Sequence, residues 1–430
     1  MSRSGKLRAL RHRLGRQATP DKAASDLRVE TLEPRLLLSA NPVTVSDMAT
    51  RLDTSLITGV TVITHGFQPE FISDGDSLLG LGRAIVNFGR NVDTQVEPAT
   101  GIDPGAWLLD YDLDVEGDSG IFDLTQSELP PLGGRAGELV LVYDWAVESN
   151  EHAAGWTEAA GEGLFSLLAA LDLVDPAHPE DSKPLHFIAH SFGAAVTSEA
   201  VERLGYYGVE VDQVTLLDPH DFDQGLFGFD TAQDQDALGL PLGYGATRWS
   251  NVGFMDVYFQ TRNENSNLLP DSWVPAGRPI PGAYNRFLDV ELPVSGSYGA
   301  GDASGDHTYA WSAFYASTIP GAFDYNAATN LLTERLDIDN DRSLDVVAGP
   351  TDRAGLRQNE FTGFSLSRLA HGESRRPAAD FYGLAADDQA AHRYTPADLR
   401  PLSNTEPGHA EPVDAGVSPV WTPFGDGGVI

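Results

Sequence analysis

Hydrophobic positions along the middle of the chain follow two different periods. Short runs rich in β-branched and aliphatic residues are typical of buried strands, and apolar residues three and four positions apart are typical of helices. Runs of the first kind occupy residues 59–64, 138–145, 185–189, 211–217 and 252–260. Helical patterns occupy residues 78–88, 156–171 and 194–204. Because strands and helices alternate, the sequence predicts an α/β fold with a mostly parallel, doubly wound sheet.

One predicted strand passes into a predicted helix through the turn Ala189-His190-Ser191-Phe192-Gly193. This is the small-x-Ser-x-Gly spacing of a nucleophile elbow, with alanine at the first small position. Small residues are needed on both sides because the sharp turn packs strand against helix and holds the serine in strained backbone geometry. The alternative is a chance pentapeptide, so the assignment of Ser191 as a nucleophile depends on the rest of the chain.

Two later residues complete the set that a catalytic serine needs. Asp218 ends the strand that follows the elbow helix, and His307 lies in a Gly/Asp-rich loop just before an amphipathic helix. The order serine, acid, histidine is that of α/β hydrolases and differs from the order in trypsin-like and subtilisin-like enzymes. We therefore expect Ser191, Asp218 and His307 to form a catalytic triad. The rivals for the acid are Asp256 and Glu264, and the rivals for the histidine are His220 and His190.

A His-Gly pair follows the first buried strand, at His65-Gly66-Phe67. Loops at the carboxyl ends of parallel strands are where α/β sheets place their chemistry, and glycine lets a backbone approach a substrate closely. We expect the backbone N–H groups of Phe67 and Phe192 to form an oxyanion hole. An ordinary tight turn is the alternative interpretation of the His-Gly pair.

Four segments of the chain match a known family position by position. They are His65-Gly66-Phe67, the elbow at 189–193, Leu217-Asp218-Pro219 and His307. In these segments the chain resembles the lipase branch of the α/β-hydrolase superfamily, and more narrowly the pancreatic-lipase-like families, which carry the acid after the strand that follows the elbow. The resemblance covers roughly residues 55–320. It implies an α/β-hydrolase fold with insertions at the carboxyl edge of the sheet, and an activity as a serine ester hydrolase that works through an acyl-enzyme.

Composition and charge narrow the function classes. The 430 residues are 41% hydrophobic and include no cysteine, which excludes disulfides, thiolate zinc sites and a cysteine nucleophile. The formal net charge is −35, but residues 1–40 carry nine Lys and Arg against four Asp and Glu, leaving 19 against 59 in the remainder. So acidic a body repels nucleic acid and anionic membranes, which excludes a nucleic-acid-binding role.

The basic N-terminus differs in kind from the remainder. The run Leu32-Glu33-Pro34-Arg35-Leu36-Leu37-Leu38 resembles the LEPR-XLL segment of certain large bacterial surface and extracellular proteins, which implies an extracellular or cell-surface location. A frayed basic leader of a cytoplasmic protein is the alternative. No run reaches the roughly 18 apolar residues of a membrane-spanning helix. The expected division is a leader at 1–44, a catalytic domain at 52–325, an acidic segment at 326–370 and a flexible tail or linker at 371–430.

Two acidic stretches inside the expected catalytic domain carry open interpretations. Residues 110–118 place five acids at alternate positions, which is typical of a solvated strand face and also of a calcium site. Residues 220–250 mix aspartates with large apolar side chains and form a long connection. A loop of this length is either functional, as a lid or acyl-binding wall, or a disordered insertion.

The acidic segment contains a pattern of a calcium loop. Asp337, Asp339, Asp341 and Asp345 stand at loop positions 1, 3, 5 and 9, where carboxylates bind calcium in loops of this type. Arg342 and Ala348 stand where an EF-hand has glycine and glutamate, so the pattern is closer to dockerin-like or repeat-type loops. We expect a structural calcium ion here, and an acidic surface turn is the alternative.

The expected activity is hydrolysis of a neutral, apolar acyl ester such as a lipid or a small ester, with no cofactor required for the chemistry. Two alternatives remain open at the level of the sequence. One is a non-catalytic surface or adhesion module on a hydrolase fold, because folds host many functions. The other is a serine peptidase or amidase, which would use the same residues.

Overall fold

The structure is a computed structural model of the whole chain, which divides into two compact units at 1–40 and 41–430. All described residues belong to the second unit. They are residues 43–66, 78–91, 105–113, 120–130, 136–145, 154–221, 246–260, 277–280, 282–288, 306–338, 343–349, 362–377 and 381–382.

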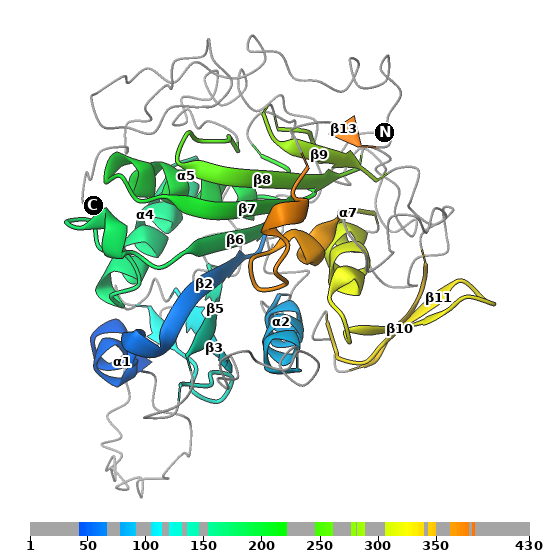
Figure 1. The fold of residues 1–430 in the computed structure, drawn as a ribbon, viewed down its shortest axis with the longest axis horizontal. Helices are drawn as coiled ribbons and strands as arrows, with labels where there is room; N and C mark the ends of the chain where they lie inside the picture. Colours follow the sequence, from blue (N-terminus) through cyan, green and yellow to red (C-terminus); the bar gives the residue numbers. More distant parts are fainter. Residues whose placement is uncertain are drawn as a thin grey trace, which may run out of the picture. The chain divides into compact units, whose positions relative to one another are not determined.

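A mixed sheet dominates the described residues, with the strand order β1-β4-β3-β5-β2-β6-β7-β8-β9-β13 (Figure 1). Every neighbouring pair from β3 to β13 is parallel, and β4 pairs antiparallel with both β3 and β1. The strands are β1 (Val43–Thr44), β2 (Ile57–Thr64), β3 (Gly105–Asp112), β4 (Ile121–Phe122), β5 (Gly137–Asp144), β6 (Leu185–His190), β7 (Val211–Leu217), β8 (Val252–Phe259), β9 (Tyr284–Phe287) and β13 (Phe381–Tyr382). The expected largely parallel α/β sheet is therefore present.

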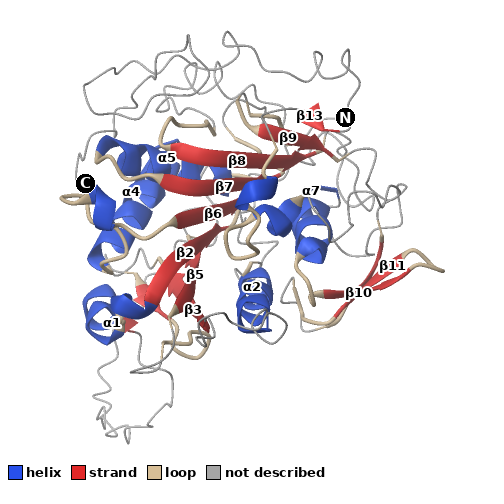
Figure 2. Cartoon of the chain, viewed as in Figure 1, coloured by secondary structure: helices blue, strands red, loops and turns tan. Residues whose placement is uncertain are grey.

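Helices cover both faces of this sheet (Figure 2). One hydrophobic core includes residues of α1 (Val45–Arg51), α4 (Ala154–Ala170) and α5 (Gly193–Tyr206). A second core includes residues of α2 (Leu79–Asn91), α7 (Asp306–Tyr309) and the π-helix η5 (Ala310–Tyr315) that continues it. Since both faces are covered, the central strands are buried almost throughout, which explains why they appear in the sequence as continuous apolar runs.

Smaller elements complete the described residues. A second, antiparallel sheet has the order β10-β11-β12. Its strands are β10 (Phe323–Asn326), β11 (Leu331–Glu334) and β12 (Val346–Ala348). The short 3₁₀ helices are η1 (Thr54–Leu56), η3 (Pro179–Asp181), η6 (Ala316–Thr318), η7 (Gly363–Leu366) and η8 (Glu373–Arg375).

The described elements extend beyond the expected limits of the catalytic domain at both ends. Strand β1 and helix α1 precede residue 52. Met48 of α1 is buried in the same hydrophobic core as residues of α4. Residues 371–377 were expected in a flexible tail. In the structure they lie against the sheet, where Arg376 forms an ion pair with Asp212 of β7. The two acids Asp110 and Asp112 belong to β3, while residues 114–118 of the acidic stretch lie outside the described residues.

The strand order reverses direction around β2. From β2 the chain builds β3 and β5 on one side, and from β6 it builds β7, β8 and β9 on the other. Thr64 at the end of β2 pairs in register with Ala189 near the end of β6. Ligands of open α/β sheets bind outside the carboxyl ends of the strands at such a reversal. The segments after β2 and β6 therefore meet at the expected binding position.

Candidate active site

Ser191 occupies the sharp turn between β6 and α5. Its φ of 53° lies in the left-handed region, which is uncommon for a residue other than glycine, and its side chain is buried. A Cβ atom on Gly193 would stand 2.4 Å from the carbonyl oxygen of His65, and one on Gly66 would stand 2.5 Å from the Cβ of Ser191. The turn after β2 therefore lies in close contact with the turn that carries Ser191. Glycine at positions 66 and 193 allows this close approach.

Asp218 follows β7 and is completely buried, again with a positive φ, of 46°. Its Oδ2 lies 2.6 Å from Nδ1 of His307. The backbone N–H of Gln260 donates to Oδ1 at 2.8 Å, and the Gln260 side-chain amide donates to Oδ2 at 2.7 Å. Because an ionised carboxylate only accepts hydrogen bonds, this set of three donors suits the charged form of Asp218.

His307 lies in the first turn of α7 and is buried. Burial lowers the pKa of His307 well below its usual value, and the nearby His220 lowers this pKa further. The imidazole is therefore neutral at pH 7, and because Nδ1 donates to Asp218, its lone pair is on Nε2. The structure thus places the carboxylate of Asp218 and a neutral His307 ring in direct contact.

His190, the residue before Ser191, contacts His307 directly. Nε2 of His190 donates to the backbone carbonyl oxygen of His307 at 3.2 Å, and the two ring centroids are 4.5 Å apart. Burial, followed by the proximity of His307, lowers the pKa of His190 well below its usual value, so this ring is neutral as well. His190 therefore supports the position of His307.

The rival residues lie in other surroundings. Asp256 is fully buried and accepts hydrogen bonds from Gln213, Thr215 and Tyr258. The ring of His220 stands 6.3 Å from that of His307, centroid to centroid. Glu264 lies outside the described residues. Of the candidate acids and histidines that the sequence offers, Asp218 and His307 are found in direct side-chain contact.

The turn after β2 is fixed by residues from β5. His65 Nδ1 donates to the carbonyl oxygen of Gly66 at 2.7 Å, and the Trp145 backbone N–H donates to His65 Nε2 at 2.9 Å. The Trp145 indole N–H donates to the carbonyl oxygen of His65 at 2.8 Å, and the two rings stack with centroids 5.7 Å apart. Asp144 Oδ1 also lies 3.0 Å from His65 Nε2. This arrangement orients the chain leading to Phe67, which itself lies outside the described residues.

Trp145 and Gln260 are the site residues that the sequence did not reveal. Trp145 could have been found from the predicted topology, since it follows the strand that pairs with β2 in the register Thr64 to Tyr143. Residues that follow two adjacent parallel strands must meet. Gln260 follows β8 in the same way, beside the end of β7 that carries Asp218.

The long connection at 220–250 is described only at its two ends. Asp221 accepts the backbone N–H of Ala246 at 2.6 Å and pairs with Arg278, whose guanidinium also donates to the Ala246 carbonyl at 2.9 Å. This buried ion pair joins the two ends of the connection. Residues 222–245, for which a lid or a disordered insertion was expected, lie outside the described residues.

The calcium pattern is likewise described only in part. Asp339 and Asp341 lie outside the described residues, while Asp337 precedes the buried Ile338 and Asp345 accepts a hydrogen bond from Ser343. Within the described residues, no group of three or more His, Cys, Asp or Glu side chains could hold a metal ion. None of the described helices combines the length and the apolar character needed to cross a membrane.

Replacing Gly66 by alanine tests the close approach of the two turns. We expect the rate at which Ser191 reacts with a fluorophosphonate to fall by roughly 10²-fold, because the new methyl group displaces the elbow and with it the Ser191 hydroxyl. Gly163→Ala in α4 is the matched control, since the added Cβ would meet only the Tyr143 hydroxyl within 4 Å, at 3.0 Å. Labelling of Gly66→Ala at the wild-type rate would show that the turn after β2 does not constrain Ser191.

No family model matches the chain, and no curated protein matches it. One solved structure, described as "the putative cell surface hydrolase from Lactobacillus plantarum WCFS1", aligns with 14% sequence identity over 50% of this chain and 74% of that one. Its TM-score is 0.29, which is too low to support a conclusion about fold or function.

Proposed function

We propose that the protein is a serine ester hydrolase of the lipase or carboxylesterase type, built on an α/β-hydrolase fold. The observation that carries the proposal is the 2.6 Å contact between Asp218 and His307, beside an elbow that holds Ser191 in left-handed geometry. The parallel order around β2 and the position of the acid after β7 support the assignment of the fold.

In the proposed reaction, Ser191 Oγ attacks the acyl carbonyl carbon while its proton passes to Nε2 of His307. The oxyanion is stabilised by the backbone N–H groups of Phe192 and Phe67. His307 then gives the proton to the leaving alcohol, and an acyl-enzyme remains. Water, deprotonated by His307, attacks this ester, and the released serine regains its proton. Asp218 holds the Nδ1–H tautomer throughout and stabilises the transient imidazolium.

The charge of the chain favours a neutral substrate. A body with 19 basic and 59 acidic residues repels anionic ligands, so the proposed substrates are lipids or small esters with an uncharged acyl group. No cofactor takes part in these steps. A structural calcium ion at 337–345 and an extracellular or cell-surface location, inferred from the LEPR-XLL-like run, belong to the same proposal.

The experiment is labelling with a fluorophosphonate, with the adduct located by mass spectrometry, followed by hydrolysis of p-nitrophenyl esters from acetate to palmitate. We expect a single adduct at Ser191 and a labelling rate that falls only well below pH 6.5, because the pKa of His307 is lowered by burial. Faster turnover of a p-nitroanilide than of every ester would indicate an amidase or peptidase. A folded protein that is neither labelled nor active would indicate a non-catalytic surface module.

The predicted calcium loop is tested in the same assay. If calcium is structural, EGTA should lower the unfolding temperature and leave the relative rates on the different esters unchanged. An EGTA-insensitive unfolding temperature would favour an acidic surface turn at 337–345.

A further inference from the structure

A layer of buried polar side chains occupies the sheet face that also carries Ile63, Ile188 and Leu217. None of these polar residues is more than 4% exposed. The polar layer consists of Thr61, Glu138, His186, Gln213, Thr215, Asp256 and Tyr258, contributed by β2, β5, β6, β7 and β8. Burying polar groups is costly unless they form hydrogen bonds, so a layer of this size requires a consistent set of partners.

Hydrogen bonds converge on Asp256 within this layer. Thr215 donates to Oδ1 at 2.8 Å, Gln213 donates to the same atom at 3.0 Å, and Tyr258 donates to Oδ2 at 2.9 Å. Since the Thr215 hydroxyl uses its proton here, it accepts from Nε2 of His186 at 2.9 Å. Burial lowers the pKa of His186 to about 3, so this ring is neutral and has one proton to donate.

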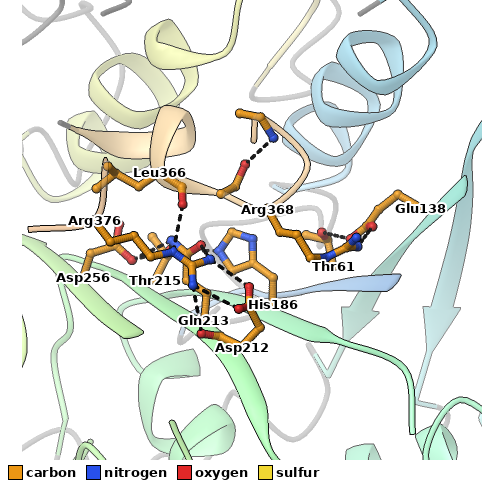
Figure 3. Close-up of polar contacts among 12 residues, drawn as sticks. Thr61, Glu138, His186, Asp212, Gln213, Thr215, Asp256, Leu366, Arg368 and Arg376 are labelled. Carbon is orange, nitrogen blue, oxygen red and sulfur yellow. Dashed lines mark hydrogen bonds and ion pairs between the residues drawn. The ribbon is translucent and has the colours of Figure 1, made fainter. Parts of the chain in front are cut away.

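Residues 362–377, which we call the C-terminal strap, cover the polar layer (Figure 3). Arg368 pairs with Glu138, and Arg376 donates to both carboxylate oxygens of Asp212 at 3.0 and 2.7 Å. Arg376 also donates to Gln213 Oε1 at 3.1 Å. The strap is thus held by charge pairs to several strands, in addition to the buried side chains of Phe364 and Leu366.

Tyr258 connects the strap to the candidate active site. Its backbone carbonyl oxygen accepts the N–H of Asp218 at 2.6 Å, and its hydroxyl accepts the N–H of Gly363 in the strap. Its ring packs against Phe314 and Tyr315, with centroid distances of 5.7 and 6.0 Å. One residue therefore contacts the backbone of the acid, the helical segment that follows the histidine, and the strap.

The strap also contacts the end of that helical segment directly. The N–H of Phe364 donates to the Thr318 hydroxyl at 2.9 Å, and this hydroxyl donates to the carbonyl oxygen of Tyr315 at 2.6 Å. Arg286 of β9 donates to Thr362 and lies over the ring of Phe314, 5.1 Å from its centroid. Residues 306–318, which begin with α7 and His307, are thus held between the sheet and the strap.

We propose that the C-terminal strap, through the Tyr258 hydroxyl and the Thr318 hydroxyl, positions the helical segment that carries His307 against Asp218. This inference rests on the proposed function, in which His307 is the base. Tyr258 and Thr318 are positioning residues, because neither touches the reacting atoms.

The test compares two tyrosines that each lose one buried hydroxyl. Tyr258→Phe removes the contact to Gly363 and to Asp256. Tyr143→Phe is the matched control, because Tyr143 is equally buried and donates to the Ala160 carbonyl at 2.9 Å in the other core. We expect Tyr258→Phe to slow labelling of Ser191 about ten- to hundredfold through misplacement of the base. Tyr143→Phe should label within about twofold of wild type at a comparable loss of stability.

The pH profile separates positioning from general destabilisation. The titratable groups around the His307 ring are Asp218, His190 and His220. Its pKa is lowered first by burial, so a loosened segment that admits water returns this pKa toward its usual value. The acid limb of labelling should therefore move to higher pH in Tyr258→Phe and stay in place in Tyr143→Phe. Identical profiles in both variants would overturn the inference.

A second pair of variants tests the inference independently, in case Tyr258→Phe does not fold. Thr318→Val removes the hydroxyl that accepts from Phe364, while Thr318→Ser retains it. We expect the valine variant to label slowly and the serine variant to recover most of the rate. Equal rates for valine and serine would contradict the proposed role of the strap.

Hydrogen exchange separates this inference from the proposed function. In Tyr258→Phe, the amides of residues 306–318 should exchange faster than in wild type, whether or not the protein is catalytic. If wild type is not labelled but exchange rises in this way, the proposed function fails and the structural coupling stands. If wild type is labelled and neither exchange nor rate changes in Tyr258→Phe, the function stands and the positioning role is refuted.

Discussion

Ser191→Ala is expected to abolish fluorophosphonate labelling and to lower ester hydrolysis by roughly 10⁴- to 10⁶-fold, the range seen when a catalytic serine is removed. The change deletes only the hydroxyl oxygen that attacks the carbonyl in the proposed reaction. Alanine and serine have similar difficulty with the left-handed backbone at this position, where φ is 53°, so the fold should be unaffected. The measurements are the labelled fraction by intact mass and the initial rate on the best p-nitrophenyl ester.

Ser198→Ala in α5, the helix that follows the turn of Ser191, is the control for this result. Ser198 is buried, and its hydroxyl accepts the N–H of Thr247 at 3.2 Å and the indole N–H of Trp249 at 3.0 Å. Leaving these donors without their acceptor should cost about 1–3 kcal/mol of stability while labelling continues. Hydrolysis that persists in Ser191→Ala at more than a few per cent of wild type would refute the assignment of the nucleophile.

The sequence predicts this fold well where burial is uniform and poorly where it is not. Strands β2, β5, β6, β7 and β8 are covered on both faces, so each appears as a run of apolar residues that needs no partner to be recognised. Strand β9 is short and includes two polar residues, Asn285 and Arg286, that are buried through specific hydrogen bonds, and β13 has only two residues. A pattern based on hydrophobicity has no means of finding them.

The same limit applies to the C-terminal strap. Residues 371–377 of the strap fall in the stretch 371–430, whose lack of periodicity predicts a flexible tail or linker, because disorder is expected where little apolar area can be buried. The attachment of the strap combines the buried Phe364 and Leu366 with the ion pairs of Arg368 and Arg376. The partners of these arginines, Glu138 and Asp212, stand 230 and 164 positions earlier in the chain. Pairing over such separations leaves no local trace in the sequence.

The candidate site divides in a similar way. Ser191 and Asp218 sit at positions that a turn motif and a strand end define locally, so the sequence alone could nominate them. The contact of Asp218 with His307 spans 89 positions and depends on how α7 packs on the sheet. Sequence reasoning could rank Asp218 above Asp256, and only the packing of α7 decides which carboxylate faces the histidine.

Asp218→Asn is the second substitution with a large expected effect, a loss of about 10³- to 10⁴-fold in turnover. An amide at this position presents an NH₂ group toward Gln260 or His307, both of which donate in the wild type. His307 relieves the conflict by taking the other tautomer, with its proton on Nε2, and it can then no longer accept the proton of Ser191. The measurement is turnover of the ester with saturating substrate, alongside the labelling rate.

Asp256→Asn is the comparison that makes this result decisive, because the two acids are the rivals that the sequence offers. We expect Asp256→Asn to lose no more than about tenfold, the effect of altering the support beneath Tyr258. Burial raises the pKa of Asp256 to about 6 from a usual value of 3.8, so the folded protein favours the protonated form. The stability that this group contributes is complete below about pH 4 and is lost as pH rises through about 6, on the order of 3 kcal/mol. Urea unfolding should show this decline in wild type and not in Asp256→Asn. If Asp256→Asn loses turnover 10³-fold while Asp218→Asn retains it, Asp256 is the catalytic acid and the proposed triad is wrong.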